Sequence, residues 1–362
     1  MTKCVVLILL IFASLLVCVL PITNAQSSQP IIINGNGVVT PADAAIQMVG
    51  NTYTVTADII GSIVVEANNI ILDGANHTLQ GPGIYPIKMG MNLTAANVTV
   101  INFQITNWHV GILGAWNNNT IANNGFRNNY QAIAIYADDY VVCQNSFSNN
   151  SIGVFVDGGA FRSQGDNNFV SQNQLINNGV AFDVMNSDGT TITQNNVTNN
   201  RYILELATNT RHTTLYRNNF VDNQEALIIP FGGPTLKDIV AFSPAGQWDN
   251  GTVGNYWSDY QTKYFNATEI GQTATGNIPY EITSTLPFST SENGINESGI
   301  VVLGTAIDNH PLMAPTTIST TPGVRSTNPS PSIPELPIAI ALITPLVATG
   351  AVALFALRNK KT

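Results

Sequence analysis

The stretch from Asn119 to Asn223 repeats one phrase five times, as NTIANNGFRNN (119–129), YVVCQNSFSNN (140–150), NFVSQNQLINN (168–178), TTITQNNVTNN (190–200) and TTLYRNNFVDN (213–223). In each phrase a β-branched or apolar residue is followed three positions later by Asn and five positions later by an apolar residue. The two sets are Asn124, Asn145, Asn173, Asn195 and Asn218, and Phe126, Phe147, Leu175, Val197 and Phe220. Successive phrases lie roughly 21 to 28 residues apart, a period that indicates a solenoid of stacked repeats.

The pattern inside each phrase predicts strands and turns. Apolar residues alternate with polar ones at period two, in short β-branched runs broken by Asn, Gly, Ser and Asp. Helical repeats do not show this alternation, and the signals of leucine-rich repeats and propeller blades are absent. The sequence therefore predicts an all-β fold, a single parallel β-helix whose coils rise by about 4.8 Å.

The repeated Asn is expected to form a ladder along the stack, because equivalent residues of neighbouring coils lie directly above one another. Each side-chain amide would donate to the next rung and satisfy backbone groups at the turn, and Asn tolerates the left-handed backbone that such a turn requires. In the preceding coil, ANVTVINFQITN (96–107), Phe103 takes the Asn position and Ile105 the apolar position. The ladder should therefore begin one coil later.

Composition excludes some classes of function. Only 10% of the 362 residues are charged and the formal net charge is −9, so the basic surface of a nucleic-acid-binding protein is missing. Cys4 and Cys18 lie in the first apolar segment, which leaves Cys143 alone in the rest of the chain. No intramolecular disulfide is possible in the body, so its stability must come from the stacking of coils.

The two ends of the chain indicate export and membrane anchoring. Residues 1–25 resemble a secretory signal peptide, with an uncleaved anchor as the alternative. Residues 337–357 are long and apolar enough to span a bilayer, and the basic residues after them predict a cytoplasmic tail and an extracellular body at the cell surface. The predicted order is a signal peptide (1–25), entry strands and a first coil (26–83), β-helix coils (84–231), a capping region (232–315), a Thr/Ser/Pro-rich stalk (316–336), a transmembrane helix (337–357) and a cytoplasmic tail (358–362).

Three phrases after the coils carry a resemblance to a known family: GNYWSDY (254–260), NIPYEI (277–282) and DNHPLMAP (308–315). Together with the Asn-rich repeats, they resemble archaeal surface proteins of the NosD-like right-handed β-helix family. The resemblance covers most of the mature chain and implies a right-handed coil. Members often have an acidic, glycine-rich loop before the IPY-like phrase that could hold calcium. Here that loop reads EIGQTATGNIPY (269–280), with one Glu and no Asp, which argues against a metal there.

No cofactor or metal is predicted for this chain. The His residues are dispersed without metal-ligand spacing, and Met89 and Met91 form the only soft pair on one strand face, so the copper implied by the family name is not expected. The His residues are His77, His109, His212 and His310.

An aromatic cluster follows the coils and has two interpretations. Its members are Trp248, Tyr256, Trp257, Tyr260 and Tyr264. The rings could form a platform on which sugars stack, since an aromatic ring offers an apolar face with a polar edge. Alternatively, they cover the open end of the β-helix and shield its unpaired strand edges.

Three acidic residues are candidates for chemistry. When the strands after the Asn turns are aligned by their apolar residues, Asp157, Asp183 and Glu205 fall at one outward position. Stacked about 5 Å apart, these carboxylates could hold a cation or serve as an acid and base pair for glycoside cleavage. The alternative is a solvated acidic edge.

The same alignment places a column of apolar residues on the outward face. They are Leu113, Ala134, Phe155, Ala181, Ile203 and Ile228. Solvent-facing positions should not favour apolar residues over several coils, so we expect this column to be covered. The cover is either the segment 232–314 folded back along the helix, or a partner subunit or apolar ligand.

N-glycosylation sequons are frequent in the chain. They lie at Asn76, Asn92, Asn97, Asn118, Asn149, Asn196, Asn250, Asn266 and Asn296. Exposure on an exported β-helix would make several of them available.

These features favour a membrane-anchored extracellular β-helix that acts as a surface binding or structural module toward glycans or surface-layer components. The alternative is a polysaccharide lyase or glycoside hydrolase of the β-helix class. The Gly-His-Gly and Arg-Ile-Lys phrases of pectin hydrolases are missing, and no Arg sits in a recognisable lyase phrase. The sequence therefore favours binding over catalysis.

Overall fold

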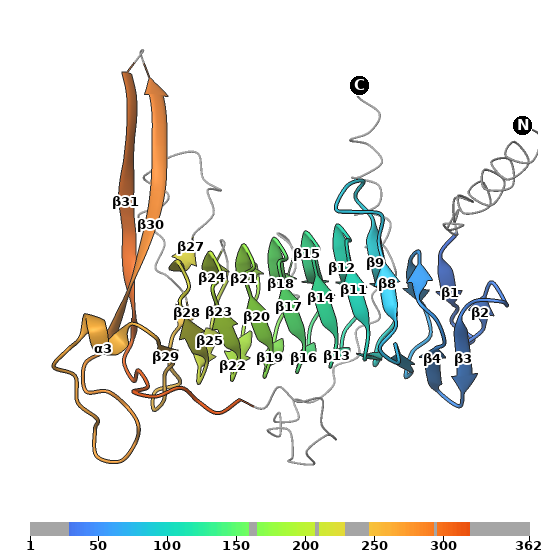
Figure 1. The fold of residues 1–362 in the computed structure, drawn as a ribbon, viewed down its shortest axis with the longest axis horizontal. Coiled ribbons are helices and arrows are strands. Elements are labelled where there is room, and N and C mark those ends of the chain that lie inside the picture. Colours follow the sequence, from blue (N-terminus) through green and yellow to red (C-terminus); the bar gives the residue numbers. More distant parts are fainter. Residues whose placement is uncertain (1–28, 159–164, 207–209, 229–245, 293–294, 319–362) are drawn as a thin grey trace, which may run out of the picture. The chain divides into compact units, whose positions relative to one another are not determined.

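Three β-sheets enclose the hydrophobic core of the protein (Figure 1). The computed structural model describes residues 29–158, 165–206, 210–228, 246–292 and 295–318. In the described ranges between residues 52 and 257, each coil contributes one strand to each sheet, and the strands of successive coils pair in parallel. At the N-terminal end, Ile31–Ile33 pairs antiparallel with Val39–Thr40, and Ile46–Val49 pairs antiparallel with Thr52–Val55. The predicted parallel β-helix is confirmed.

The sheets are named A, B and C. Along the stack, sheet A contains β2 (Val39–Thr40), β1 (Ile31–Ile33), β6 (Ile63–Val65), β9 (Met89–Leu93), β12 (Val110–Gly114), β15 (Gln131–Ile135), β18 (Ile152–Asp157), β21 (Val180–Met185), β24 (Tyr202–Leu206) and β27 (Glu225–Ile228). Sheet B contains β3 (Ile46–Val49), β4 (Thr52–Val55), β7 (Ile71–Asp73), β10 (Thr99–Ile101), β13 (Thr120–Ala122), β16 (Val141–Cys143), β19 (Phe169–Ser171), β22 (Thr191–Thr193), β25 (Thr213–Tyr216) and β28 (Gly246–Gln247). Sheet C contains β5 (Ile59–Ile60), β8 (Thr78–Gln80), β11 (Gln104–Thr106), β14 (Gly125–Arg127), β17 (Ser146–Ser148), β20 (Gln174–Ile176), β23 (Asn196–Thr198), β26 (Asn219–Val221) and β29 (Tyr256–Trp257).

The apolar residues of the phrases stack in one column on sheet C, and this column lies in the interior. Phe126 pairs with Phe147 in the neighbouring strand, and their rings stack with centroids 5.0 Å apart. The column continues through the other phrases and is at most 2% exposed throughout. Burying one such side chain contributes roughly 1.5 to 3 kcal/mol, so this column is a main source of the stacking energy.

The predicted Asn ladder is present and buried. Each side-chain carbonyl of Asn145, Asn173, Asn195 and Asn218 accepts two hydrogen bonds from the rung before it, one from the backbone N–H and one from the amide. The first rung, Asn124, accepts from the backbone N–H of Phe103, so the ladder begins one coil after Phe103, as expected. The rungs therefore satisfy backbone donors that strand pairing leaves free at the turn.

A second, parallel ladder was not predicted. It is formed by the last Asn of each phrase: Asn129, Asn150, Asn178, Asn200 and Asn223. The left-handed backbone also falls elsewhere than expected, because it lies on the residue before each rung, such as Gln144 at φ 57°. The Asn of each rung is therefore selected by its amide and not by its tolerance of positive φ.

The first ladder ends in a carboxylate. Asn255 accepts from the backbone N–H and amide of Asn218, and Asp308 Oδ2 accepts from the backbone N–H of Asn255 at 2.7 Å. The indole N–H of Trp257 donates to the same oxygen at 3.0 Å. A carboxylate only accepts, so it suits the final rung, which has no further rung to donate to. Burial raises the pKa of Asp308 to about 6, although these hydrogen bonds oppose the shift.

The three C-terminal phrases meet in a cap over the last coil. The cap also includes α3 (Tyr260–Lys263) and the beginning of the hairpin of β30 (Tyr280–Glu292) and β31 (Ile295–Asp308). The ring of Trp257 stacks on Tyr280 with centroids 4.1 Å apart, and lies 4.8 Å from Phe220 in the last coil. Gly254 is required because a Cβ at this position would overlap the carboxyl of Asp308. Contacts inside the cap therefore explain these phrases.

Several predicted segments lie outside the described residues. These are the signal peptide (1–25), all but the first three residues of the stalk (316–336), the transmembrane helix (337–357) and the tail (358–362). In the described ranges, no helix has the length and hydropathy needed to cross a bilayer.

Candidate functional site

The acidic residues predicted on the outward face lie on sheet A, but not in one column. Asp183 pairs with Glu205 on one side and with Phe155 on the other, whereas Asp157 pairs with Met185. The predicted alignment was therefore wrong by two residues for β18. Strand pairing instead follows the last Asn of each phrase. A strictly alternating pattern looks the same after a shift of two residues, so an argument from alternation cannot detect such a shift.

The predicted apolar column is corrected in the same way. By strand pairing, the outward column consists of Leu113, Ala134, Phe155, Asp183, Glu205 and Ile228. Ala181 and Ile203, at 0% and 2% exposed, belong to the core cluster instead. Each is followed by a second core residue, as Ala181 is by Phe182. Two consecutive inward residues break the alternation on which the prediction relied.

Two apolar residues of this column, Ala134 and Phe155, are buried. Ala134 and Phe155 are 0% and 7% exposed and form a cluster with Val110 that is separate from the core. Tyr136 packs edge-on against Phe155, with centroids 5.8 Å apart. Of the covering segment that was predicted, residues 232–245 lie outside the described residues.

Burial makes Asp183 an unusual acid. Its side chain is 2% exposed, and its Oδ1 has no hydrogen-bond partner. Burial raises the pKa of Asp183 to about 8, with smaller contributions from the charges of Glu205 and Asp157. Burial also raises the pKa of Glu205. Asp183 is therefore protonated at neutral pH, next to a second carboxyl group, which is the arrangement of a general acid and its partner.

The phenol of Tyr136 belongs to the same environment. Burial raises the pKa of Tyr136 to about 12, and the charges of Asp157 and Asp183 contribute. Asp157 accepts a hydrogen bond from the amide of Asn186 at 2.9 Å. Within the part of the chain that the structure describes, no three His, Cys, Asp or Glu side chains are grouped to hold a metal ion.

The aromatic cluster is part of the cap, and the sugar-platform interpretation is wrong for three of its rings. Trp248, Trp257 and Tyr260 are 1%, 3% and 1% exposed, so their faces are not available to a ligand. Tyr256 is half-buried at the edge of sheet C. The rings cover the end of the β-helix, which was the alternative interpretation, because they pack on Phe220 of the last coil.

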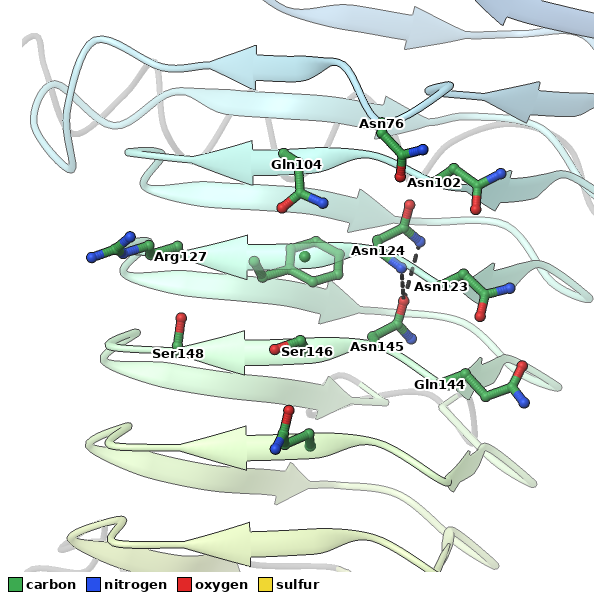
Figure 2. A pocket seen from close by; sticks show the side chains of 13 residues that line it. Asn76, Asn102, Gln104, Asn123, Asn124, Arg127, Gln144, Asn145, Ser146 and Ser148 are labelled. Atoms are coloured by element: carbon green, nitrogen blue, oxygen red, sulfur yellow. Dashed lines mark hydrogen bonds between the residues drawn. The ribbon is translucent and has the colours of Figure 1, made fainter. Parts of the chain in front are cut away.

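A polar groove on the outer face of sheet C was missed by sequence reasoning (Figure 2). It has a volume of about 280 Å³. Its lining residues are Asn76, Asn102, Gln104, Asn123, Asn124, Gly125, Phe126, Arg127, Gln144, Asn145, Ser146, Ser148 and Gln174. Gly125 makes the hollow, because a Cβ there would meet the side-chain amide of Gln104.

The groove presents uncommitted polar groups. Gln104, Gly125, Ser146 and Gln174 occupy equivalent positions in four neighbouring strands. Among the described residues, nothing hydrogen-bonds to the side chains of Gln104, Ser146 or Gln174, so their donors and acceptors are free for a ligand. The signal in the sequence was that polar or small residues occupy the same position in successive phrases. The same pattern is also expected for an ordinary solvent-exposed face of a sheet.

An exposed aromatic row was also missed. Tyr85 is 71% and Tyr130 37% exposed, and His109 lies between their rings. The rings of His109 and Tyr130 stack with centroids 4.8 Å apart. Tyr130 follows Arg127 at the turn between sheets C and A, so this row begins beside one end of the groove.

The predicted sequons differ in accessibility. Exposed Asn side chains occur at Asn76, Asn97, Asn118, Asn149, Asn250 and Asn266. Asn92 and Asn196 are half-buried, and the side chain of Asn296 lies outside the described residues.

Comparison with known proteins agrees with the fold. No curated protein matches the chain. The family described as the right-handed β-helix region matches residues 89–237, the stretch that contains the second Asn ladder and the first ladder as far as Asn218. Together with the parallel strand pairing in the three sheets, this match supports a parallel β-helix in the central part of the chain.

Proposed function

We propose that this protein is an extracellular binding module that recognises glycans through the groove on sheet C. The observation that carries the proposal is the row of uncommitted amides and hydroxyls over four coils. A sugar hydroxyl both donates and accepts, and a side-chain amide offers both functions on one rigid plane. The groove is close to the lower limit of about 300 Å³ for small-molecule sites, so it suits a short stretch of a longer glycan.

The location of the module is part of the proposal. The signal-like segment 1–25 and the apolar segment 337–357 with its basic tail support an exported body on a membrane anchor. Six exposed sequon Asn residues support glycosylation of that body. The resemblance of the C-terminal phrases to NosD-like archaeal surface proteins supports a role at the cell surface, with glycans or surface-layer components as partners.

Filling the groove should abolish binding without unfolding the protein. In Gly125→Val, the added side chain enters the space beside Gln104, so we expect at least a tenfold loss of affinity in a panel of neutral and acidic oligosaccharides. Calorimetric titration of the full-length protein in detergent measures the loss. Gln104→Ala should act in the same direction, and Gln131→Ala on the outer face of sheet A is the matched control. The proposal would be refuted if no oligosaccharide of the panel bound. It would also be refuted if Gly125→Val and Gln104→Ala bound the oligosaccharides as tightly as the unmodified protein does.

Glycoside hydrolysis on sheet A is the second candidate. It is favoured by the protonated Asp183 beside Glu205, because neighbouring strands lie about 4.8 Å apart and retaining glycosidases hold their carboxyl groups roughly 5 to 5.5 Å apart. We favour glycan binding in the groove over hydrolysis at Asp183, because the groove is open to a ligand whereas Asp183 is 2% exposed.

Release of reducing ends from the same panel tests this second candidate. Activity should disappear in Asp183→Asn, which cannot donate the proton, and persist in the exposed control Asp43→Asn. No release by the unmodified protein would exclude hydrolysis of these substrates. Formation of unsaturated products would instead indicate a lyase.

A further inference from the structure

Arg127 distinguishes one end of the groove from the rest. It is the only charged residue in β8, β11, β14, β17, β20, β23 and β26 of sheet C, all of which are described. Its side chain is exposed, and no carboxylate of the described residues lies within ion-pair distance. Figure 2 shows it at the end of the groove opposite Asn102 and Asn123. A guanidinium without an internal partner, in a lining that is otherwise neutral, is placed to receive an anion from a ligand.

From this placement we infer that the groove takes an acidic sugar whose carboxylate is held by Arg127. The planar guanidinium matches a carboxylate in a bidentate pair, whereas the amides and hydroxyls of Gln104, Ser146 and Ser148 suit the ring hydroxyls. The inference rests on the proposed glycan-binding function and specifies its ligand class.

The opposite end of the groove gives the ligand a direction. Asp73 Oδ1 accepts hydrogen bonds from the amide of Asn102 at 3.0 Å and from the backbone N–H of Ala75 at 2.8 Å. A negative charge therefore lies behind Asn102, and a positive charge lies at Arg127. This polarity places the carboxylate end of the ligand at Arg127 and a neutral part at Asn102.

The number of acidic groups in the ligand is limited by the charge of the protein. With one cation in the groove and a formal net charge of −9, a polyanion would place further carboxylates over neutral rungs of an acidic protein. A glycan in which single uronate residues are flanked by neutral sugars fits better.

The aromatic row provides a second contact near Arg127. Tyr130 is three positions after Arg127, so the distance between their Cα atoms is at most about 10 Å. Tyr130 is 37% exposed and presents a ring on which the apolar face of a sugar can stack. A uronate at this end of the groove would thus meet a cation and an aromatic face together.

Matched ligands test the inference. The full-length protein is titrated with oligosaccharides that contain one glucuronic acid and with their carboxyl-reduced counterparts. We expect the acidic member of each pair to bind at least tenfold more tightly, since charge-assisted bidentate contacts are about twice as strong as neutral ones. Arg127→Gln should abolish this preference and Arg127→Lys should retain part of it. Arg201→Gln, which removes an exposed charge immediately before β24, should leave the preference unchanged.

The outcomes separate this inference from the proposed function. Equal affinity for both members of a pair, with both lost in Gly125→Val, would overturn the acidic ligand and keep the glycan site. If neither the acidic oligosaccharide nor its carboxyl-reduced counterpart binds, the inference is overturned. If no oligosaccharide of the wider panel binds, the proposed glycan-binding function is overturned as well. Tyr130→Ala should weaken both members by a similar factor. Unchanged binding in Tyr130→Ala would overturn the placement of the sugar beside Arg127.

Discussion

Replacing Asp183 by Asn will stabilise the protein at alkaline pH and have little effect at acid pH. Burial raises the pKa of Asp183 from the ordinary 3.8 to about 8 in the folded protein. The folded state therefore holds this proton more tightly than the unfolded state, so its stabilising contribution is complete below pH 4 and is lost as the pH rises through about 8. Asn has the shape of the protonated acid and does not titrate.

The expected size of this effect is several kcal/mol. At 1.36 kcal/mol per pH unit, the interval between the two pKa values gives at most about 6 kcal/mol at pH 9. Thermal melts of Asp183→Asn and the unmodified protein from pH 4 to pH 9 would show a difference that grows with pH. Asp43→Asn, at an exposed position, should give no such trend. A difference that is constant with pH would mean that Asp183 titrates as an exposed acid.

Local spacing was sufficient to predict the ladder and the stacking of equivalent residues. Asn145 and Phe147, for example, are two residues apart in one phrase, and their partners Asn124 and Phe126 lie at the same two positions of the preceding coil. Stacking makes the environment of each position repeat, so the sequence repeats as well. The same logic predicted that Phe103 precedes the first rung.

Features that depend on contacts between distant segments could not be predicted in this way. The burial of Trp257 requires Phe220, Tyr280 and Asp308, which no local pattern brings together. The register of β18 was ambiguous because alternation is unchanged by a shift of two residues. The groove depends on a side chain that is missing at Gly125, and only the neighbouring coils show what that absence leaves open.

The ladder makes Asn195→Leu the most destabilising single change that we expect outside the cap. Asn195 Oδ1 accepts from the backbone N–H and amide of Asn173, and its amide donates to the carbonyl of Val170 at 3.0 Å. Leu removes these partners while the groups stay buried, and each unsatisfied group costs roughly 1 to 3 kcal/mol. For these three groups the sum is about 3 to 9 kcal/mol, a large part of the total stability of a typical domain, roughly 5 to 15 kcal/mol.

The loss of stability depends on whether the replaced amide is buried or faces outward, and a matched pair of variants can test this. Gln174→Leu also replaces an amide by Leu on sheet C, but it faces outward and loses no hydrogen bond among the described residues, so its effect should stay within about 0.5 kcal/mol. Melting temperature and urea midpoint measure both variants. Equal melts for Asn195→Leu and Gln174→Leu would show that the ladder amides contribute nothing beyond their solvated counterparts. A large loss confined to Asn195→Leu would establish that buried amide rungs, together with the apolar column, hold the coils in register in a body with no disulfide.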